Sequence, residues 1–395
     1  MLTNRQVFLN NLAQTSTTPL ALEIEKAEGV YLYDNKGKKY IDFISGIAVS
    51  NVGHRHPKVI AAIEAQLGKY MHLMVYGEYV QSPQVLLAQK LASLLPKSLS
   101  SIYFVNSGSE ATEGAMKLAK RYTGRTQIIS FQNAYHGSTQ GSLSIMGGEL
   151  FKNAYRPLLP DTLQIEYNSI EELEKITRRT ACVVVETIQG EAGALVPSQK
   201  FLVALRRRCS DVGALLVLDE VQCGFGRTGS FFAFEQFNIE PDILTIAKGM
   251  GGGMPIGAFI SSKEIMNTLT NNPVLGHITT FGGHPVSCAA SIACIEVIEE
   301  ENLVEQVSDK EKLIRSLLKN SNIKQIHGRG LLLAVEFEFS AINMKVIDNC
   351  IKNGVIVDWF LFADNKMRIA PPLTITKDEI KNACEIIIAS IEKSI

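Results

Sequence analysis

Two apolar segments of this sequence each end in a residue that can do chemistry. Asp219 follows the run LLVL, and Lys248 follows LTIA and precedes the glycine-rich turn GMGGGMP. An acid beside a pyridine nitrogen keeps the ring protonated and able to accept carbanion electrons, and a lysine amine can form an imine and move a proton. A lone lysine at a strand end is more often a solvated surface residue, but the small residues beside Lys248 allow a ligand to come close. The pair predicts a site for a pyridine-aldehyde cofactor.

A second segment, FVNSGSEATEGAMKLAKR, has the pattern of a strand, a turn of small residues and a helix. The backbone N–H groups of Gly108 and Ser109 at the start of that helix are suited to binding a phosphate without a positive side chain. The same residues also fit a helix that is simply capped by Ser107 or Ser109. By itself this segment leaves both interpretations open.

The segment FQNAYHGSTQGS places Tyr135 and His136 in a loop after another apolar run. An aromatic ring there can stack on a flat cofactor, although a loop aromatic more often covers the end of a strand. We interpret the other histidines as structural and predict no metal site, because none of them has the spacing of a metal ligand; they are His54, His56, His72, His277, His284 and His327.

Short runs rich in β-branched residues predict the strands that would position these residues. The runs are 102–106, 127–131, 162–166, 181–186, 214–220, 243–248 and 256–261. Helical patterns such as 110–122 and 199–213 lie between them, the second ending at Gly213 as at a C-cap. Strands and helices that alternate in this way predict an α/β fold with a largely parallel sheet, whose ligand site lies at the carboxyl ends of the strands.

The two ends of the chain predict a second, smaller unit. The segment GVYLYDNKGKKYIDFIS has the pattern of a hairpin with Asn35 and Gly37 in its turn. A long helical stretch over 288–320 is followed by an apolar run at 331–338, a helix near 343–353, an apolar run at 355–360 and a last helix from about 377. We expect an N-terminal segment, 1–55, that joins a small C-terminal α+β domain, 301–395, and a large domain over 56–300.

Composition excludes several classes of function. Lys and Arg number 39 against 40 Asp and Glu, so there is no charge excess of the kind that binds nucleic acid or anionic lipid. No run approaches the roughly 20 apolar residues of a membrane helix, and the start lacks the pattern of a signal peptide. The cysteines are seven, an odd number without a CxxC pair, and are expected to be free thiols, several of them buried. We predict a cytoplasmic protein that acts on small molecules.

Taken in order, the motifs resemble the class III (ω-type) aminotransferases of pyridoxal-5′-phosphate (PLP) fold type I. The resemblance covers most of the chain, through YIDFISGIAVSNVGHRHP, NSGSEATEGAMKLAKR, YHGST, VVVETIQGEAG, VLDEVQCGFGRTG, DILTIAKGMGGGMPIGA, TTFGGHPVSCAA and MRIAPPLTIT. Within the class the chain is most similar to acetylornithine and succinylornithine aminotransferases, in its length and in Ile47, where ornithine aminotransferases have a tyrosine. The fold implied is a large domain with a seven-stranded, mostly parallel sheet plus a smaller α+β domain.

The resemblance also implies how PLP is held. Lys248 would be the Schiff-base lysine, Asp219 would contact the pyridine nitrogen, and Gln222 would lie near the ring hydroxyl. The ring would lie between Val221 and Tyr135. These implied roles agree with the chemistry that the types and positions of Asp219 and Lys248 suggest.

For the phosphate, the resemblance implies Gly108 and Ser109 together with Thr280 of a second subunit. The site would then be complete only in a homodimer. Thr279, the other threonine of TTFGGHP, is placed with the substrate-binding residues.

Arg368, in MRIAPPL, is implied as the partner of the α-carboxylate of glutamate or 2-oxoglutarate, a match between a guanidinium and a carboxylate. Glu191, in QGEAG, would neutralise Arg368 while the ω-amino donor is bound and leave it free for the keto acid. The alternative for Arg368 is a surface arginine of the C-terminal domain. Glu186 is expected only to line the pocket.

Two positions depart from the family pattern. Acetylornithine enzymes usually have an arginine in the loop after the stacking aromatic, to hold the donor's carboxylate, and this chain has Ser138 there. The family also tends to have an aromatic residue before the N-terminal Pro-Leu, where this chain has Thr17 and Thr18. Both changes concern the donor side of the pocket, so they leave transamination intact and put the acyl group of the donor in question.

The function implied is PLP-dependent transfer of the ω-amino group of N-acetylornithine or N-succinylornithine to 2-oxoglutarate, giving a semialdehyde and glutamate, in arginine biosynthesis. Other ω-amine donors remain open, namely ornithine, 4-aminobutyrate and succinyldiaminopimelate. From a different class, an aminomutase of the glutamate-1-semialdehyde type would need no external keto acid. A protein that binds the cofactor without catalysis is a third alternative, which Lys248 together with Asp219 argues against.

Overall fold

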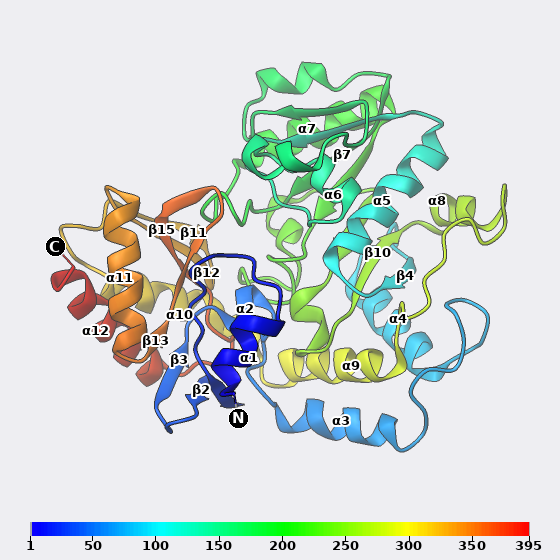
Figure 1. The fold of residues 1–395 in the computed structure, drawn as a ribbon. Helices are drawn as coiled ribbons and strands as arrows, with labels where there is room; N and C mark the ends of the chain where they lie inside the picture. Colours follow the sequence, from blue (N-terminus) through cyan, green and yellow to red (C-terminus); the bar gives the residue numbers. More distant parts are fainter. Residues whose placement is uncertain (1, 395) are drawn as a thin grey trace.

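The computed structural model describes residues 2–394, and its largest sheet has seven strands (Figure 1). In sheet order they are β4 (Ser101–Val105), β10 (Gly257–Ser261), β9 (Ile243–Ile246), β8 (Leu215–Asp219), β7 (Thr180–Glu186), β5 (Gln127–Phe131) and β6 (Thr162–Ile165). β10 runs antiparallel to β4 and β9, and the other neighbours are parallel. Each strand overlaps one of the predicted runs. The predicted α/β fold with a mostly parallel seven-stranded sheet is therefore confirmed.

Both faces of this sheet are covered. In β8, Leu215 and Val217 belong to the core cluster that includes residues of α5 (Gly108–Thr123), whereas Leu216 and Leu218 belong to the cluster that includes residues of α7 (Gln199–Val212). Successive side chains of a strand point to opposite faces, so a strand covered on both sides must be apolar throughout. α7 ends at Gly213, which adopts φ 68° as the predicted C-cap.

Further helices belong to the part of the chain that contains the large sheet. They are α3 (Pro57–Leu67), α4 (Ser82–Leu94), α6 (Gln140–Ser144), α8 (Lys263–Met266) and α9 (Pro285–Glu300). Short 3-10 segments are η1 (Glu149–Phe151), η2 (Asn153–Tyr155), η3 (Glu171–Lys175), η4 (Ala233–Phe237), η5 (Lys248–Gly251) and η6 (Asn267–Thr270).

Two smaller sheets contain the ends of the chain. One has the order β1 (Ile24–Glu28), β2 (Tyr31–Asp34), β3 (Lys39–Asp42), β13 (Val355–Ile356), and the other β11 (Gln325–Arg329), β12 (Leu332–Glu336), β15 (Ala363–Ile369), β14 (Asp358–Phe360). The accompanying helices are α1 (Asn4–Asn11), α2 (Ser45–Ala48), α10 (Leu303–Leu317), α11 (Ser340–Lys352) and α12 (Lys377–Glu392). β3 pairs in parallel with β13, so residues from the two ends of the chain share a sheet, as the blue and orange elements of Figure 1 show.

Two details of the tail differ from the sequence prediction. The helical stretch over 288–320 is two helices, α9 and α10, because Asn302 between them has a left-handed φ of 49° that interrupts the helical backbone. The run at 355–360 is two strands, β13 and β14, which belong to different sheets. The hairpin of β2 and β3 and the final helix α12 are confirmed. The domain boundaries at 55 and 300 stay predictions.

Two further observations concern the cysteines and the lengths of the helices. All seven cysteines are buried free thiols, as predicted. Within residues 2–394, no helix has both the length and the apolar composition needed to cross a lipid bilayer.

Candidate active site

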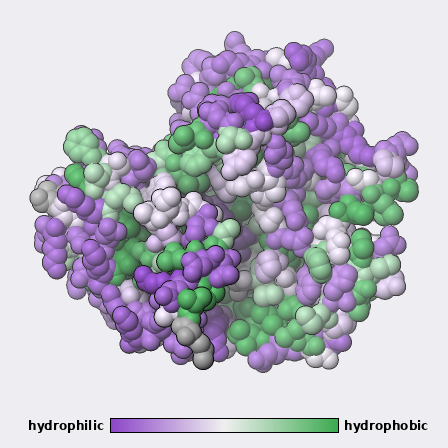
Figure 2. All heavy atoms as spheres, in the orientation of Figure 1, coloured by the Kyte–Doolittle hydropathy of each residue, from purple (hydrophilic) through white to green (hydrophobic). Residues whose placement is uncertain are grey.

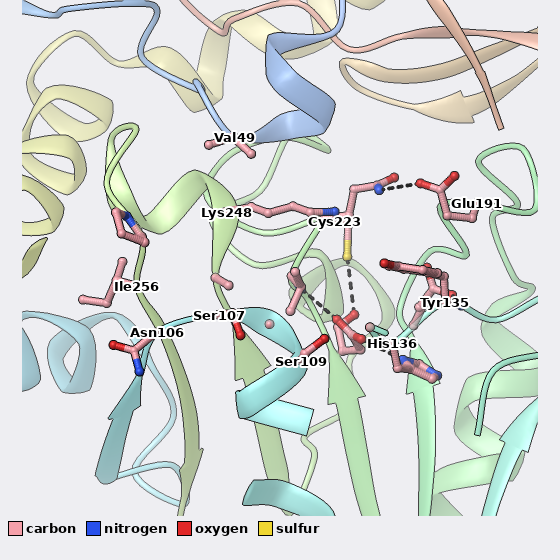
Figure 3. A pocket seen from close by; sticks show the side chains of 18 of the residues that line it. Val49, Asn106, Ser107, Ser109, Tyr135, His136, Glu191, Cys223, Lys248 and Ile256 are labelled. Carbon is pink, nitrogen blue, oxygen red and sulfur yellow. Dashed lines mark hydrogen bonds and ion pairs between the residues drawn. The ribbon is translucent and has the colours of Figure 1, made fainter. Parts of the chain in front are cut away.

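The residues predicted to take part in the chemistry lie together at the carboxyl edge of the large sheet. Asp219 is the last residue of β8, Glu186 is the last of β7 and pairs with it in register, and Lys248 follows β9. All three line one cavity of about 430 Å³, a size typical of sites for small ligands. Figure 3 shows the Lys248 side chain extending into this space. The predicted position of the site is therefore the position of the cavity.

Lys248 has an unusual backbone and environment. Its φ is 45°, in the left-handed region that costs energy for a residue with a side chain. Burial lowers the pKa of its amine, although the carboxylate of Glu191 opposes the shift. A lowered pKa increases the fraction of the neutral amine, which is the form that acts as a nucleophile and base.

Asp219 is fixed from two directions. Its Oδ2 lies 2.7 Å from Nδ1 of His136, and its Oδ1 accepts a hydrogen bond of 2.9 Å from the backbone N–H of Val221. Burial alone would lower the pKa of His136, but the hydrogen bond and charge of Asp219 outweigh it and raise that pKa. The sequence places His136 in this loop and by itself indicates no role for it. Its position beside Tyr135, in a loop at the same edge of the sheet, was the available signal.

Glu186 holds two loops of the cavity. One carboxylate oxygen accepts from the backbone N–H of Tyr135 at 3.0 Å, and the other accepts from Gly190 at 2.7 Å. Burial raises its pKa to about 7, with His136 acting in the opposite direction. Glu186 lines the cavity, as expected, and also connects the loop of the aromatic residue to the QGEAG loop.

The start of α5 provides backbone donors at the cavity. Ser107 is the N-cap and its side chain accepts from Glu110 N–H, so the predicted cap is present. Within the described part of the chain, the N–H groups of Gly108 and Ser109 have no protein acceptor, and both residues line the cavity. A helix start with free N–H groups is suited to an anion, so the two interpretations of this segment are compatible.

Tyr135 and Val221, the residues expected on the two faces of a cofactor ring, both line the cavity. Val221 also packs closely on the backbone of Gly108, where an added Cβ would lie 2.8 Å from a Val221 methyl. The Tyr135 hydroxyl lies 3.1 Å from the hydroxyl of Ser138. Tyr135 appears beside the cavity, with His136, in Figure 3.

Arg368 is not a surface residue, since its side chain is only 1% exposed. Its NH1 and NH2 each donate to one oxygen of Glu191, both at 2.9 Å. Gln222 donates to Glu191 at 3.1 Å, and both Gln222 and Glu191 line the cavity. Burial would raise the pKa of Glu191, but Arg368 lowers it to about 2. The residue predicted to neutralise Arg368 is thus bonded to it bidentately at the cavity wall.

Other predicted residues lie outside the cavity lining of this single chain. Ser138 is exposed, and its N–H donates to the Ser109 hydroxyl at 3.1 Å. The Thr279 hydroxyl accepts from Asn106 at 3.3 Å, and Thr280 is exposed. Ile47 is half-buried, while Val49 two residues later lines the cavity.

Comparisons with known proteins agree with this geometry. The family model described as aminotransferase class-III matches residues 12–391. The chain is 39% identical to the acetylornithine aminotransferase of Methanocaldococcus jannaschii, over 95% of both chains. It is also 39% identical to the acetylornithine aminotransferase of Methanopyrus kandleri, over 90% of both chains.

Solved structures are similar over nearly the whole chain. A structure of the ornithine aminotransferase from Toxoplasma gondii, with partial occupancy of PLP in its active site, has a TM-score of 0.91 at 29% identity, covering 98% of this chain and 92% of that one. A PLP-bound amine transaminase from an uncultivated Pseudomonas species has a TM-score of 0.89 at 25% identity, covering 97% and 99%. The family and these neighbours together imply PLP as the cofactor.

Proposed function

Since this chain belongs to the class III aminotransferases, we propose that it transfers the ω-amino group of an N-acylated ornithine to 2-oxoglutarate, giving a semialdehyde and glutamate. It is an aminotransferase by family, and the donor is proposed from the acetylornithine aminotransferases to which it is similar. N-acetylornithine is the first donor to test, with N-succinylornithine beside it. The corresponding pathway would be arginine biosynthesis.

The residues of the cavity fit PLP. The free N–H groups of Gly108 and Ser109 suit its phosphate, and Asp219 is a fixed carboxylate that suits a protonated pyridine nitrogen. Val221 and Tyr135 both line the cavity, and their side chains suit the faces of a flat ring. When bound, PLP supplies an aldehyde that combines with amines and a ring that accepts electrons from the reacting carbon.

Lys248 and Asp219 would then have separate tasks. The Lys248 amine would hold the cofactor between turnovers. Once displaced by the substrate amine, its Nζ would be free to take a proton from the reacting substrate carbon and to deliver that proton to the aldehyde carbon of the cofactor. Asp219 would keep the ring nitrogen protonated, and His136 would keep the Asp219 carboxylate in position. The lowered pKa of Lys248 suits an amine that must accept a proton near neutral pH.

The buried pair of Arg368 and Glu191 is the observation that most favours two different substrates. A donor that presents its ω-amino group brings no α-carboxylate to Arg368, and Glu191 then neutralises the guanidinium. The keto acid brings a carboxylate that can replace Glu191. An enzyme that rearranges one substrate, as an aminomutase does, has less use for such an exchange.

A homodimer is also part of the proposal. Large apolar residues are exposed on two segments that lie side by side: Met71, Leu73, Met74, Tyr79 and Val80 on one, and Val274, Leu275, Ile278 and Phe281 on the other. The two segments are joined by the His72 side chain, which donates to the Thr280 carbonyl at 2.9 Å. Figure 2 shows apolar residues grouped near the loop after α8 and around α3 and α9. Exposed patches of this kind favour a subunit interface, which would bring Thr280 to the partner's site.

The test is a donor screen with purified holoprotein. N-acetylornithine, N-succinylornithine, ornithine, 4-aminobutyrate and succinyldiaminopimelate are each supplied with 2-oxoglutarate, and glutamate formation is measured. An acylated ornithine should give the highest kcat/KM. Turnover of glutamate-1-semialdehyde without any keto acid, in the absence of turnover with these donors, would overturn the proposal in favour of an aminomutase.

A further inference from the structure

Arg368 has a second carboxylate partner besides Glu191. Its Nε donates to Oδ1 of Asp358 at 2.9 Å, so one guanidinium pairs with two carboxylates. Asp358 is on β14, directly opposite Arg368 in the antiparallel pairing with β15. The guanidinium lies over the Phe360 ring, with Cζ of Arg368 4.2 Å from the ring centroid. Arg368 is therefore fixed from its own sheet, independently of Glu191.

The two carboxylates use different edges of the guanidinium. Glu191 occupies NH1 and NH2, which form the end that a substrate carboxylate would need, whereas Asp358 occupies Nε on the side. Departure of Glu191 thus leaves the bond of Asp358 intact. The carbonyl of Trp359, which accepts from NH2 at 3.2 Å, belongs to the same strand.

The hairpin of β14 and β15 also contacts Glu191. The backbone N–H of Leu361 donates to its Oε2 at 3.2 Å, and the N–H of Phe362 donates to its carbonyl at 3.1 Å. Movement of the Glu191 side chain would break the contact with Leu361 and keep those of Asp358 and Trp359 with Arg368. The hairpin therefore contacts both members of the pair, Glu191 through Leu361 and Arg368 through Asp358 and Trp359.

The buried positive charge of Arg368 explains why a second carboxylate partner is important. A guanidinium that is 1% exposed is very costly without a counterion, so the loss of Glu191 from an otherwise unpaired Arg368 would be strongly opposed. With Asp358 in place, Arg368 stays paired during the exchange.

We infer that Asp358 is a positioning residue that keeps Arg368 oriented and charge-compensated while Glu191 is exchanged for the carboxylate of the keto acid. The inference depends on the proposed function, because it assumes that exchange. It assigns to Asp358 a role in the keto-acid half-reaction and little role in the donor half-reaction, in which Glu191 itself holds Arg368.

The first test compares Asp358→Asn, Asp358→Ala and a control, Asp364→Asn. The asparagine keeps an acceptor for Nε without the charge, and the alanine removes both. Asp364 is an exposed residue of the same hairpin, and its side chain makes no ion pair within residues 2–394. In single-turnover experiments, kcat/KM for 2-oxoglutarate should fall about tenfold in the asparagine variant and about a hundredfold in the alanine variant. The donor half-reaction should change less than about threefold, and the control should match wild type.

The second test measures binding without turnover. Trp359 is the only tryptophan of the chain, so its fluorescence reports on this hairpin. Glutarate, a dicarboxylate without a keto group, should change that fluorescence saturably in the wild-type holoprotein and in Asp364→Asn. It should bind about tenfold more weakly to Asp358→Asn.

The outcomes separate the two proposals. If wild type reacts with 2-oxoglutarate and the Asp358 variants behave like Asp364→Asn, or lose both half-reactions equally, the role of Asp358 is overturned and the proposed function stands. If wild type neither reacts with 2-oxoglutarate nor binds glutarate, the proposed function fails and this inference fails with it. Because Asp358→Asn keeps the hydrogen bond, it tests the charge even if Asp358→Ala does not fold.

Discussion

The imidazole of His136 and the carboxylate of Asp219 form a buried pair, with Nδ1 2.7 Å from Oδ2. The two residues are 83 positions apart in the chain, and β7 lies between β5, which precedes His136, and β8, which ends at Asp219. The pairing keeps a carboxylate fixed at the edge of the sheet where a pyridine nitrogen would lie. Under the proposed function, Asp219 would be the residue whose charge matters most for the ring.

Asp219→Asn should leave PLP bound while kcat falls by at least about a hundredfold, because the ring nitrogen loses the charge that keeps it protonated. His136→Gln, which keeps the charge of the Asp219 carboxylate, should have a smaller effect. Cofactor content from absorbance and kcat from steady-state kinetics are the measurements. A fall in kcat of less than about tenfold for Asp219→Asn would contradict the role.

Lys248→Ala should abolish the covalent link to the cofactor. Treatment of the wild-type holoprotein with borohydride should fix PLP on the peptide that contains Lys248, and the variant should show no such peptide by mass spectrometry. Turnover should fall by several orders of magnitude, because the base at the reacting carbon is lost. Normal kcat in this variant would rule out Lys248 as the catalytic lysine.

The fold and the centre of the site were predictable because their signals are local. Each strand of the large sheet is an apolar run, and Asp219 and Lys248 directly follow two of these runs, so the edge of the sheet could be inferred without knowing the strand order. Arg368 and Glu191 were found only through the resemblance to a family. Their pairing across 177 positions leaves no periodic pattern in the sequence.

The contacts that were missed depend on how distant loops pack. His136 meets Asp219, Glu186 holds Tyr135 and Gly190, and Asp358 meets Arg368 only after the sheets have assembled. The break at Asn302 was missed for another reason. Apolar periodicity continues on both sides of it, and one residue with a left-handed φ is enough to separate α9 from α10.

Glu186 predicts a pH dependence of stability. Its pKa is raised from 4.5 to about 7 by burial, so the folded state favours the protonated carboxyl. The contribution of Glu186 to the free energy of unfolding is fully present below the unfolded pKa of 4.5. It is lost as pH rises through about 7, by on the order of 3 kcal/mol. Glu186→Gln should therefore show a smaller fall in Tm between pH 5 and pH 8 than wild type does. Equal falls in the two proteins would show that Glu186 does not titrate in this range.

The proposed shared site predicts complementation between two inactive variants. Thr280→Glu would place a negative charge beside the partner's phosphate, and Lys248→Ala would remove the lysine, so each should be inactive alone. Mixed dimers would contain one site with both native residues, and after refolding together the mixture should recover about a quarter of wild-type activity. Wild type should sediment as a dimer or larger assembly. A monomer that is fully active at nanomolar concentration would refute the shared site.

The Arg368 and Glu191 pair predicts opposite effects on the two half-reactions. Arg368→Ala should lower kcat/KM for 2-oxoglutarate by about a hundredfold or more and affect the ω-amine donor far less, because only the keto acid needs a free guanidinium. Glu191→Ala should instead favour α-amino acids such as glutamate, since Arg368 is then available without first breaking an ion pair. Stopped-flow measurement of each half-reaction separately, with both variants, is the experiment.

Arg368→Ala and Glu191→Ala together test the exchange, because the first removes the guanidinium of Arg368 and the second releases it from its ion pair. If both were impaired equally with both substrates, the exchange would be wrong and Arg368 would be structural, as its 1% exposure and three bonded nitrogens also allow. The proposal of an acylated ornithine as donor would then lose its main support over an aminomutase, because that support is the proposed exchange of Glu191 for a carboxylate at Arg368. Opposite shifts in the two variants, in contrast, have no explanation in a purely structural role, because a packing defect lowers both half-reactions together.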